Sequence, residues 1–289
     1  MTNQDLSALS PAHLSGAALL EKAEAVAIAK TQMDAPRVFV LAIMAGMQIG
    51  LGALFMTFVK ADLSLSFAAA SVLGGLCFSL GLICVIVAGS ELFTGNTLMV
   101  AAAMDKKIPW SALWKNWGLV LLGNLLGSLI LVGIIVGAGV WNTQAGENTI
   151  GAQMMTIAAS KVSLSPAQIF FRGIGCNFLV CLAVWMAFAG KTVIDKIFTT
   201  IFPVMAFVAL GFEHCVANMY FLPMGVIASQ SGFSAAPLSW LDAAYNIVIA
   251  TIGNTVGGAI FVGLLYWFAY RKAGAPDAPD APDADSAGK

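Results

Sequence analysis

Apolar residues fill most of this chain in stretches long enough to cross a lipid bilayer, which takes about 20 residues of helix. Three further apolar pieces are too short to cross alone: Asp105 ends the first, Glu213 ends the second, and the third stops before the loop around 229–237. We therefore predict an all-α membrane protein with six transmembrane helices, of which the second and fifth are broken. The predicted spans are 38–59, 63–90 continued by 92–104, 116–146, 164–190, 197–212 continued by 215–226, and 243–270.

The two breaks resemble each other in sequence. Residues 89–96 read GSELFTGN and residues 211–218 read GFEHCVAN, so both follow the pattern G-x-E-x-x-x-small-N. Each places a carboxylate and an amide where a lipid-spanning helix should have neither. Ionisable groups at membrane depth are costly and usually mark a substrate or ion path. Paired interruptions in two halves of a chain are typical of transport sites.

The rest of the chain also repeats. Residues 123–133 and 253–263 are identical at six of eleven positions, and both contain the pattern GN-x-x-G. Spans one to three therefore correspond to spans four to six. Because three spans per half is an odd number, the halves must insert in opposite directions, as an inverted 3+3 repeat. We expect Asn124 and Asn254 to serve packing and interhelical hydrogen bonds.

The breaks also suggest roles for their polar residues. Asn96 and Asn218 are expected to cap the half-helices, whose N-termini suit an anion. Glu91 and Glu213 are expected to be structural, tying down loop amides and offsetting helix dipoles. His214 is the one histidine in an apolar segment and can change charge near neutral pH, so we predict that it lies on the substrate path.

Basic residues indicate the orientation. With the N-terminus inside, the inner segments hold most of the lysines and arginines, whereas the outer ones hold only Lys60, Lys161 and Arg172. We expect a cytoplasmic segment 1–36 containing an amphipathic helix over 15–33, a six-helix transport domain over 37–272, and a disordered Ala-Pro-Asp tail over 273–289 that is also cytoplasmic.

Composition excludes several classes of protein. Hydrophobic residues make up 59% and charged residues 10% of the 289, and the net charge of −1 shows no basic excess for nucleic acid. His13 and His214 are far apart and no C-x-x-C occurs, so we expect no metal and no cofactor. An intramembrane enzyme would need a nucleophile and a base at membrane depth, and we expect no such pair and no enzyme here. A purely structural scaffold is not expected either, because it would have no use for paired helix breaks. A water or neutral-solute channel of aquaporin type stays open as an alternative.

Six stretches resemble the formate/nitrite transporter family: GGLCFSLGL, GSELFTGN, KNWGLVLLGNLLGS, GCNFLVCLAVWMA, FVALGFEHCVANM and IGNTVGG, within residues 74–258. The resemblance spans about residues 15–272. It implies an aquaporin-like fold, a homopentamer in the plasma (inner) membrane, and passage of small monovalent anions such as formate, nitrite or hydrosulfide. It implies no catalytic residue.

The resemblance also implies site residues. His214 resembles the central pore histidine, Thr94 the threonine facing it, Asn177 the nearby asparagine and Lys161 an anion-attracting lysine of the outer mouth. The residues that resemble the constriction are Phe78, Leu82, Leu92, Phe93, Val180 and Phe207.

The substrate stays open between formate and its alternatives. Gly95, which ends GSELFTG, and Arg172 are more similar to nitrite or hydrosulfide channels, whereas GGLCFSLGL and the GFEH region suit formate channels. We expect proton-linked passage, in which the anion gains a proton from His214 or from water and crosses an apolar pore as the neutral acid. The reason is that moving a bare anion out of water into apolar surroundings has a high free-energy cost.

Overall fold

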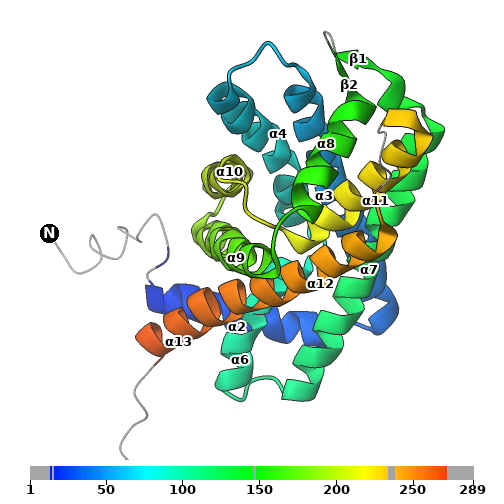
Figure 1. Cartoon of the computed structure of the whole chain (residues 1–289). Coiled ribbons are helices and arrows are strands. Elements are labelled where there is room, and N and C mark those ends of the chain that lie inside the picture. Colours follow the sequence, from blue (N-terminus) through cyan, green and yellow to red (C-terminus); the bar gives the residue numbers. More distant parts are fainter. Residues whose placement is uncertain (1–13, 15, 146–147, 234–237, 272–289) are drawn as a thin grey trace, which may run out of the picture.

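The computed structural model describes residues 14, 16–145, 148–233 and 238–271, which are predominantly helical (Figure 1). Among the described residues, one antiparallel pair of two-residue strands, β1 (Gln144–Ala145) and β2 (Asn148–Thr149), lies at one end of the bundle (Figure 1). The α-helices are α2 Gly16–Gln32, α3 Ala35–Ala61, α4 Phe67–Ala88, α5 Phe93–Asn96, α6 Val100–Met104, α7 Trp110–Gly137, α8 Ile150–Val162, α9 Pro166–Ala189, α10 Val193–Ala209, α11 Cys215–Ala228, α12 Trp240–Thr255 and α13 Leu265–Tyr270.

The six predicted spans are present, with the second and fifth discontinuous. Helices α3, α4, α7 and α9 and the continuous helix Trp240–Tyr270 are each long and apolar enough to cross a membrane. The last of these contains a π-helical stretch, Val256–Leu264, between α12 and α13. The fifth span consists of α10, with 17 residues, and α11, with 14, on the two sides of a break.

Glycines form the two breaks. Gly89 follows α4 with φ of 79°, and Gly211 follows α10 with φ of 69°, conformations that side-chain-bearing residues rarely adopt. The chain then runs extended through Leu92 and His214, the N-cap residues from which α5 and α11 begin. The predicted capping by Asn96 and Asn218 is therefore wrong, because both lie in the first helical turn rather than before it.

Hydroxyl side chains fix where several helices begin. Ser66, Thr149, Ser165 and Thr192 each accept a hydrogen bond from the backbone N–H three residues on, and Ser165 and Thr192 complete capping boxes. The Thr149 cap starts α8, a helix that the apolar pattern did not predict. The third span also differs from prediction, since α7 covers Trp110–Gly137 and the following residues turn into the hairpin.

Helix α2 lies within the range 15–33 where an N-terminal helix was predicted, and it packs on one end of the bundle, beside α6 and α13 (Figure 1). Glu24 is buried there and forms an ion pair with Lys107 in the turn after α6. Burial raises the pKa of Glu24, and the Lys107 ammonium opposes that rise. The segment 1–13 and the tail 273–289 lie outside the described residues.

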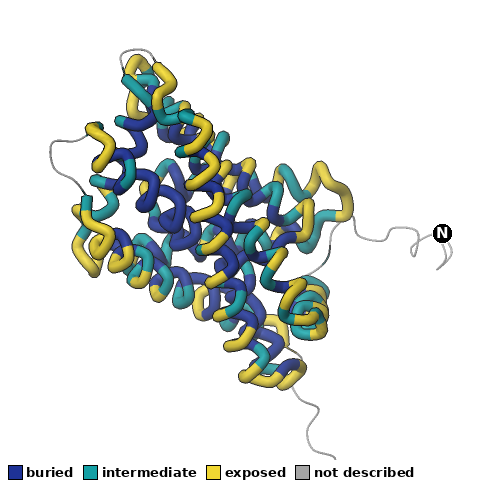
Figure 2. The backbone as a smooth tube through the Cα atoms, turned by 90° about the vertical axis from the view of Figure 1, so that its right-hand side faces the viewer, coloured by how far each residue is buried: buried dark blue, intermediate teal, exposed yellow. Residues whose placement is uncertain are grey.

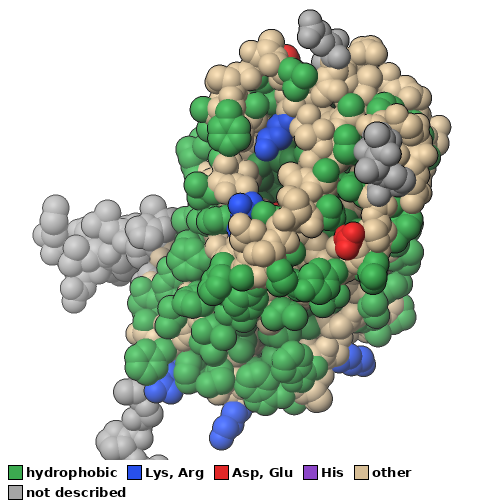
Figure 3. Space-filling model, in the orientation of Figure 1, with side chains coloured by type: hydrophobic (Ala, Val, Ile, Leu, Met, Phe, Trp, Pro, Cys, Tyr) green, Lys and Arg blue, Asp and Glu red, His purple; other side chains and the backbone are tan. Residues whose placement is uncertain are grey.

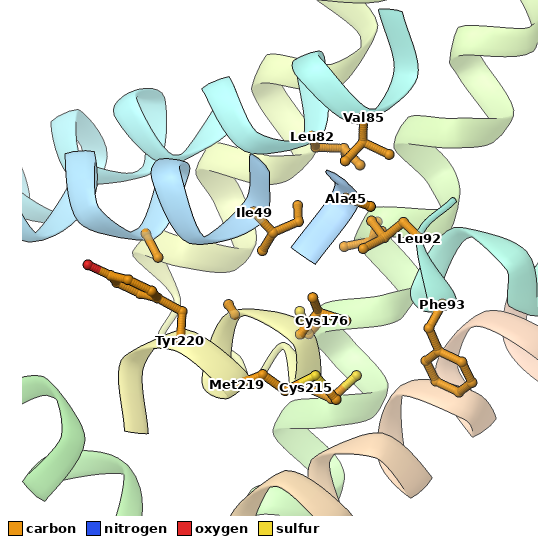
Figure 4. Packing of buried hydrophobic residues seen from close by; sticks show 14 of the residues in the cluster. Ala45, Ile49, Leu82, Val85, Leu92, Phe93, Cys176, Cys215, Met219 and Tyr220 are labelled. Atoms are coloured by element: carbon orange, nitrogen blue, oxygen red, sulfur yellow. The ribbon is translucent and has the colours of Figure 1, made fainter. Parts of the chain in front are cut away.

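Buried residues run through the centre of the bundle, and exposed ones cover its outside (Figure 2). The largest buried cluster joins both halves where the breaks meet. Figure 4 shows Leu92 beside Ala45, Leu82 beside Val85, and Cys176 near Cys215, all within this cluster. This core cluster therefore includes residues of both breaks, such as Leu92 and Cys215, packed with residues of the surrounding helices.

Helices α3 and α7 approach each other closely at Gly127. A β-carbon there would lie 2.0 Å from the carbonyl oxygen of Ile43, whereas one at Gly133 on the same helix meets nothing within 4 Å. We predict that Gly127→Ala lowers the free energy of unfolding by about 1–3 kcal/mol through overpacking. Thermal unfolding in detergent measures this. Gly133→Ala is the control, and equal unfolding temperatures for the two variants would contradict the prediction.

Candidate functional site: the paired helix breaks

His214 and Thr94 come from the two breaks and meet at the centre of the protein. The Nε2 atom of His214 lies 3.1 Å from the hydroxyl oxygen of Thr94. Both side chains are buried, with exposed fractions of 2% and 0%. The structure therefore brings together the two residues that were predicted to face each other across the path.

The second ring nitrogen of His214 fixes which tautomer is present. Its Nδ1 atom accepts a hydrogen bond of 3.0 Å from the backbone N–H of Ala217, which caps α11. Because a backbone N–H can only donate, Nδ1 carries no proton in this state. The neutral ring then carries its proton on Nε2 and donates it to Thr94.

Aromatic rings pack against one side of this pair. The ring of Phe207 lies nearly parallel to the imidazole of His214, with centroids 5.9 Å apart, and meets Phe78 edge-on at 5.6 Å. On the other side, Leu82 and Leu92 are both 2% exposed. Of these four residues, all predicted to form the constriction, Leu82 and Leu92 line one cavity and Phe78 and Phe207 line another.

Two cavities approach the pair from opposite directions. The first, the Lys30 vestibule, has a volume of about 400 Å³ and is lined by Lys22, Lys30, Lys196, Leu82, Glu91 and Leu92 among others. The second, the Lys161 vestibule, has a volume of about 160 Å³ and is lined by Lys60, Lys161, Arg172, Phe78, Phe207 and His214 among others. Lys/Arg side chains are visible in the hollow on the face shown in Figure 3.

Two asparagines hold the backbone of the breaks. Asn124 accepts from the N–H of Phe93 and donates to the carbonyls of Ala42 and Glu91, at 2.8–2.9 Å. Asn254 repeats this on the other half, with Cys215, Gly173 and Glu213, all at 2.8 Å. Both asparagines are fully buried. The expectation that they form interhelical hydrogen bonds is confirmed.

The two glutamates bind side chains rather than the predicted loop amides. Glu213 forms an ion pair with Lys161, at 2.8 Å, and accepts from the amide of Asn218, at 2.7 Å. Asn218 also donates to Asn246 on α12.

The other half repeats this arrangement in different residues. Glu91 pairs with Lys30 of α2 and accepts from Asn96, which donates to Asn116 on α7. Each glutamate is thus neutralised by one lysine. Two asparagine side chains also link it to another helix, which is α7 for Glu91 and α12 for Glu213.

Asn177 lies behind Thr94 instead of lining a vestibule. Its side-chain nitrogen donates to the Thr94 carbonyl at 3.2 Å and to the Asn254 carbonyl at 2.7 Å. The Thr94 carbonyl also accepts from the Thr97 hydroxyl at 2.6 Å and from the Cys181 thiol at 3.3 Å. Three donors on one carbonyl fix the position of Thr94.

Phe93 was predicted to belong to the constriction, and the structure contradicts this. Its ring packs edge-on against Trp117 of α7, with centroids 6.1 Å apart, and it points away from Leu92 (Figure 4). Leu92 is extended and Phe93 begins α5, so their side chains point in opposite directions. Leu92 and Phe93 therefore cannot both face the predicted path. Val180 is fully buried on α9 and lines neither vestibule.

Sequence reasoning missed Lys30, Asn116, Asn246 and Lys60 as site residues. A signal for the asparagines was available, because Asn116 and Asn246 differ by the same 130 positions as Asn124 and Asn254. Lys30 carried no such signal, since its glutamate is 61 positions away in sequence.

A family model described as formate/nitrite transporter matches residues 17–268, which include both breaks and both asparagines. The chain belongs to the formate/nitrite transporter family. It is 37% identical over 268 residues to formate channel FocA of Escherichia coli (strain K12), covering 88% of this chain and 93% of that protein. It is 39% identical over 259 residues to the uncharacterized transporter YrhG of Bacillus subtilis (strain 168), covering 88% and 92%.

Solved structures of the family have the same fold. A pentameric formate channel with formate bound superimposes with a TM-score of 0.76 at 39% identity, over 82% of this chain and 98% of that one. An FNT family ion channel gives a TM-score of 0.77 at 30% identity, over 87% and 98%. The aquaporin-like architecture expected from the resemblance is confirmed, and the chain is an integral membrane transport protein.

Asn254→Leu should unfold more easily than the unmodified protein. It leaves the Cys215 N–H without its acceptor and removes a donor from the carbonyls of Gly173 and Glu213, and a buried unpaired group costs about 1–3 kcal/mol. We expect a lower unfolding temperature in detergent, measured by tryptophan fluorescence. Thr255→Val is the control, because that hydroxyl bonds only the Thr251 carbonyl. If both variants unfold at the same temperature, the Asn254 hydrogen bonds do not stabilise the fold as predicted.

Proposed function

We propose that this protein is a channel for small monovalent anions, with formate as its substrate, and that passage is linked to a proton at His214. The observation that carries the proposal is the buried His214–Thr94 pair between two cavities, each lined by three cations and one carboxylate. The similarity of this chain to a formate channel from Escherichia coli supports formate as the substrate.

Charge and shape support an anion path. Each vestibule gathers more positive than negative charge, which concentrates anions at a mouth. Helices α5 and α11 begin at the two sides of the pair, and helix N-termini favour negative charge. A small anion therefore reaches the centre easily and then meets Phe78, Phe207, Leu82 and Leu92, where an ion loses its hydration at high cost.

The proton removes that cost. In the state described, neutral His214 offers its Nε2–H as a hydrogen-bond donor. When the cap to Ala217 opens, Nδ1 takes a proton from water and the ring becomes an imidazolium. Transfer of the Nε2 proton to formate gives neutral formic acid and restores a neutral imidazole. The acid crosses the apolar constriction and releases the proton to water beyond it.

The same proposal includes assembly and location. A homopentamer is supported by the likeness to a pentameric formate channel. The excess of basic residues on one side supports an orientation in the plasma (inner) membrane with both termini cytoplasmic and the Lys161 vestibule outside. We also keep the division into a cytoplasmic segment 1–36, a transport domain 37–272 and a tail 273–289.

His214→Asn separates capping from titration. Asparagine caps helices well and cannot take up a proton at these pH values, so α11 keeps its N-terminal hydrogen bond. We predict that formate uptake into proteoliposomes rises as external pH falls from mildly alkaline to mildly acidic in the wild type. In the variant this rise should disappear. Initial rates at both pH values measure it.

The chain supplies a matched control in its other histidine. His13→Asn makes the same chemical change outside the described residues and should leave the pH profile unchanged. An unchanged profile in His214→Asn would refute the proton step. Nitrite and hydrosulfide are measured in parallel, and preferential uptake of either would replace formate as the substrate. Passage of water without any of these anions would favour a neutral-solute channel.

The oligomeric state has its own test. We expect purified protein in detergent to have the mass of five 30.1-kDa chains after correction for bound detergent. Light scattering during size-exclusion chromatography measures this mass. A monomeric or dimeric mass under several mild detergents would contradict the pentamer.

A further inference from the structure

Lys60 is the third cation of the Lys161 vestibule, beside Lys161 and Arg172. It lies in the last turn of α3, at the end of the bundle that also holds α8 and the α3–α4 loop. Its aliphatic stem runs over α4 at Gly74, where a β-carbon would come within 3.4 Å of the Lys60 Cε atom. The missing side chain at Gly74 therefore lets this lysine lie flat on α4 and reach the cavity.

The other two cations of this vestibule are already engaged. The Lys161 ammonium is 2.8 Å from Glu213, and it lies 5.5 Å from the ring centroid of Phe221. Arg172 donates to the Gly211 carbonyl at 3.3 Å. An anion that binds Lys161 must compete with a carboxylate that is 3% exposed and cannot leave.

Lys60 differs from both, since it has no hydrogen bond or ion pair with any residue in the described part of the chain. The acid closest to it in sequence, Asp62, accepts from the backbone N–H and the hydroxyl of Ser64 at 2.9 and 2.7 Å. The carboxylate that lines the same cavity, Glu213, is held by Lys161 and Asn218. No described acid neutralises Lys60.

We propose that Lys60 is the anion-capture residue of the Lys161 vestibule and sets the apparent affinity for the transported anion on that side. This inference rests on the proposed function. An unpaired ammonium at a narrow, apolar-walled mouth attracts a small anion without displacing a carboxylate, and such fields raise encounter rates by about 10-fold or more at low salt. Lys161 then serves mainly to hold Glu213 and the break in place.

Lys60→Gln tests the proposal in proteoliposomes at low ionic strength. We expect the concentration of formate that gives half-maximal uptake to rise about three- to tenfold, while the maximal rate stays the same. Adding an impermeant salt should reduce this difference, because screening acts on free charges. Lys60→Arg keeps the charge and should behave as the wild type.

The control for charge alone is Lys115→Gln. Lys115 is exposed on α7 and lines neither vestibule, so its loss changes net charge equally without changing either cavity. Half-saturation that is unchanged in Lys60→Gln, or a fall in maximal rate alone, would overturn the role of Lys60. Absence of anion uptake by the wild type would instead overturn the proposed function and this inference together. Size-exclusion profiles show whether each variant is folded.

Discussion

The structure depends on satisfying broken backbone at membrane depth. Lipid offers no hydrogen bonds, so a helix that stops inside the bilayer must have its free N–H and C=O groups paired within the protein. Asn124 and Asn254 do this with one side chain each, holding one N–H and two carbonyls. Because the carbonyls come from a neighbouring helix and from the break itself, each asparagine also fixes the helix against its neighbour.

The two halves share a frame but differ in chemistry. Leu92 and His214 occupy the same N-cap position in the two breaks. The glutamate, its lysine and the two amides are present in both halves. The two halves differ most clearly at the residues that meet at the centre, where one half offers an apolar side chain and a hydroxyl and the other an imidazole.

The buried charges, like the backbone of the breaks, have partners within the protein. The buried lysine–glutamate pairs cost desolvation, and their net worth is small unless the remaining oxygens are satisfied, as Asn96 and Asn218 satisfy them here. The pairs therefore hold the breaks in place, and the unpaired cations at the mouths leave the vestibules positive. Lysines that are paired with a glutamate and cations that are not therefore lie in the same cavities.

The sequence by itself determined the six spans and the two breaks, because lipid imposes nearly the same apolar requirement on every spanning residue, so a carboxylate or histidine such as His214 is conspicuous. Internal sequence identity gave the inverted repeat and the hydrogen-bonding asparagines Asn124 and Asn254, and resemblance to the family pointed to Thr94. Hydropathy did not predict α8, whose mixed composition carries no membrane signal. Only the tertiary structure decided that Phe93 faces Trp117, that His214 is the helix cap, and that Lys30 and Lys161 neutralise the glutamates while Lys60 stays free. Those outcomes depend on side-chain direction and on contacts between residues far apart in the chain, which no local pattern encodes.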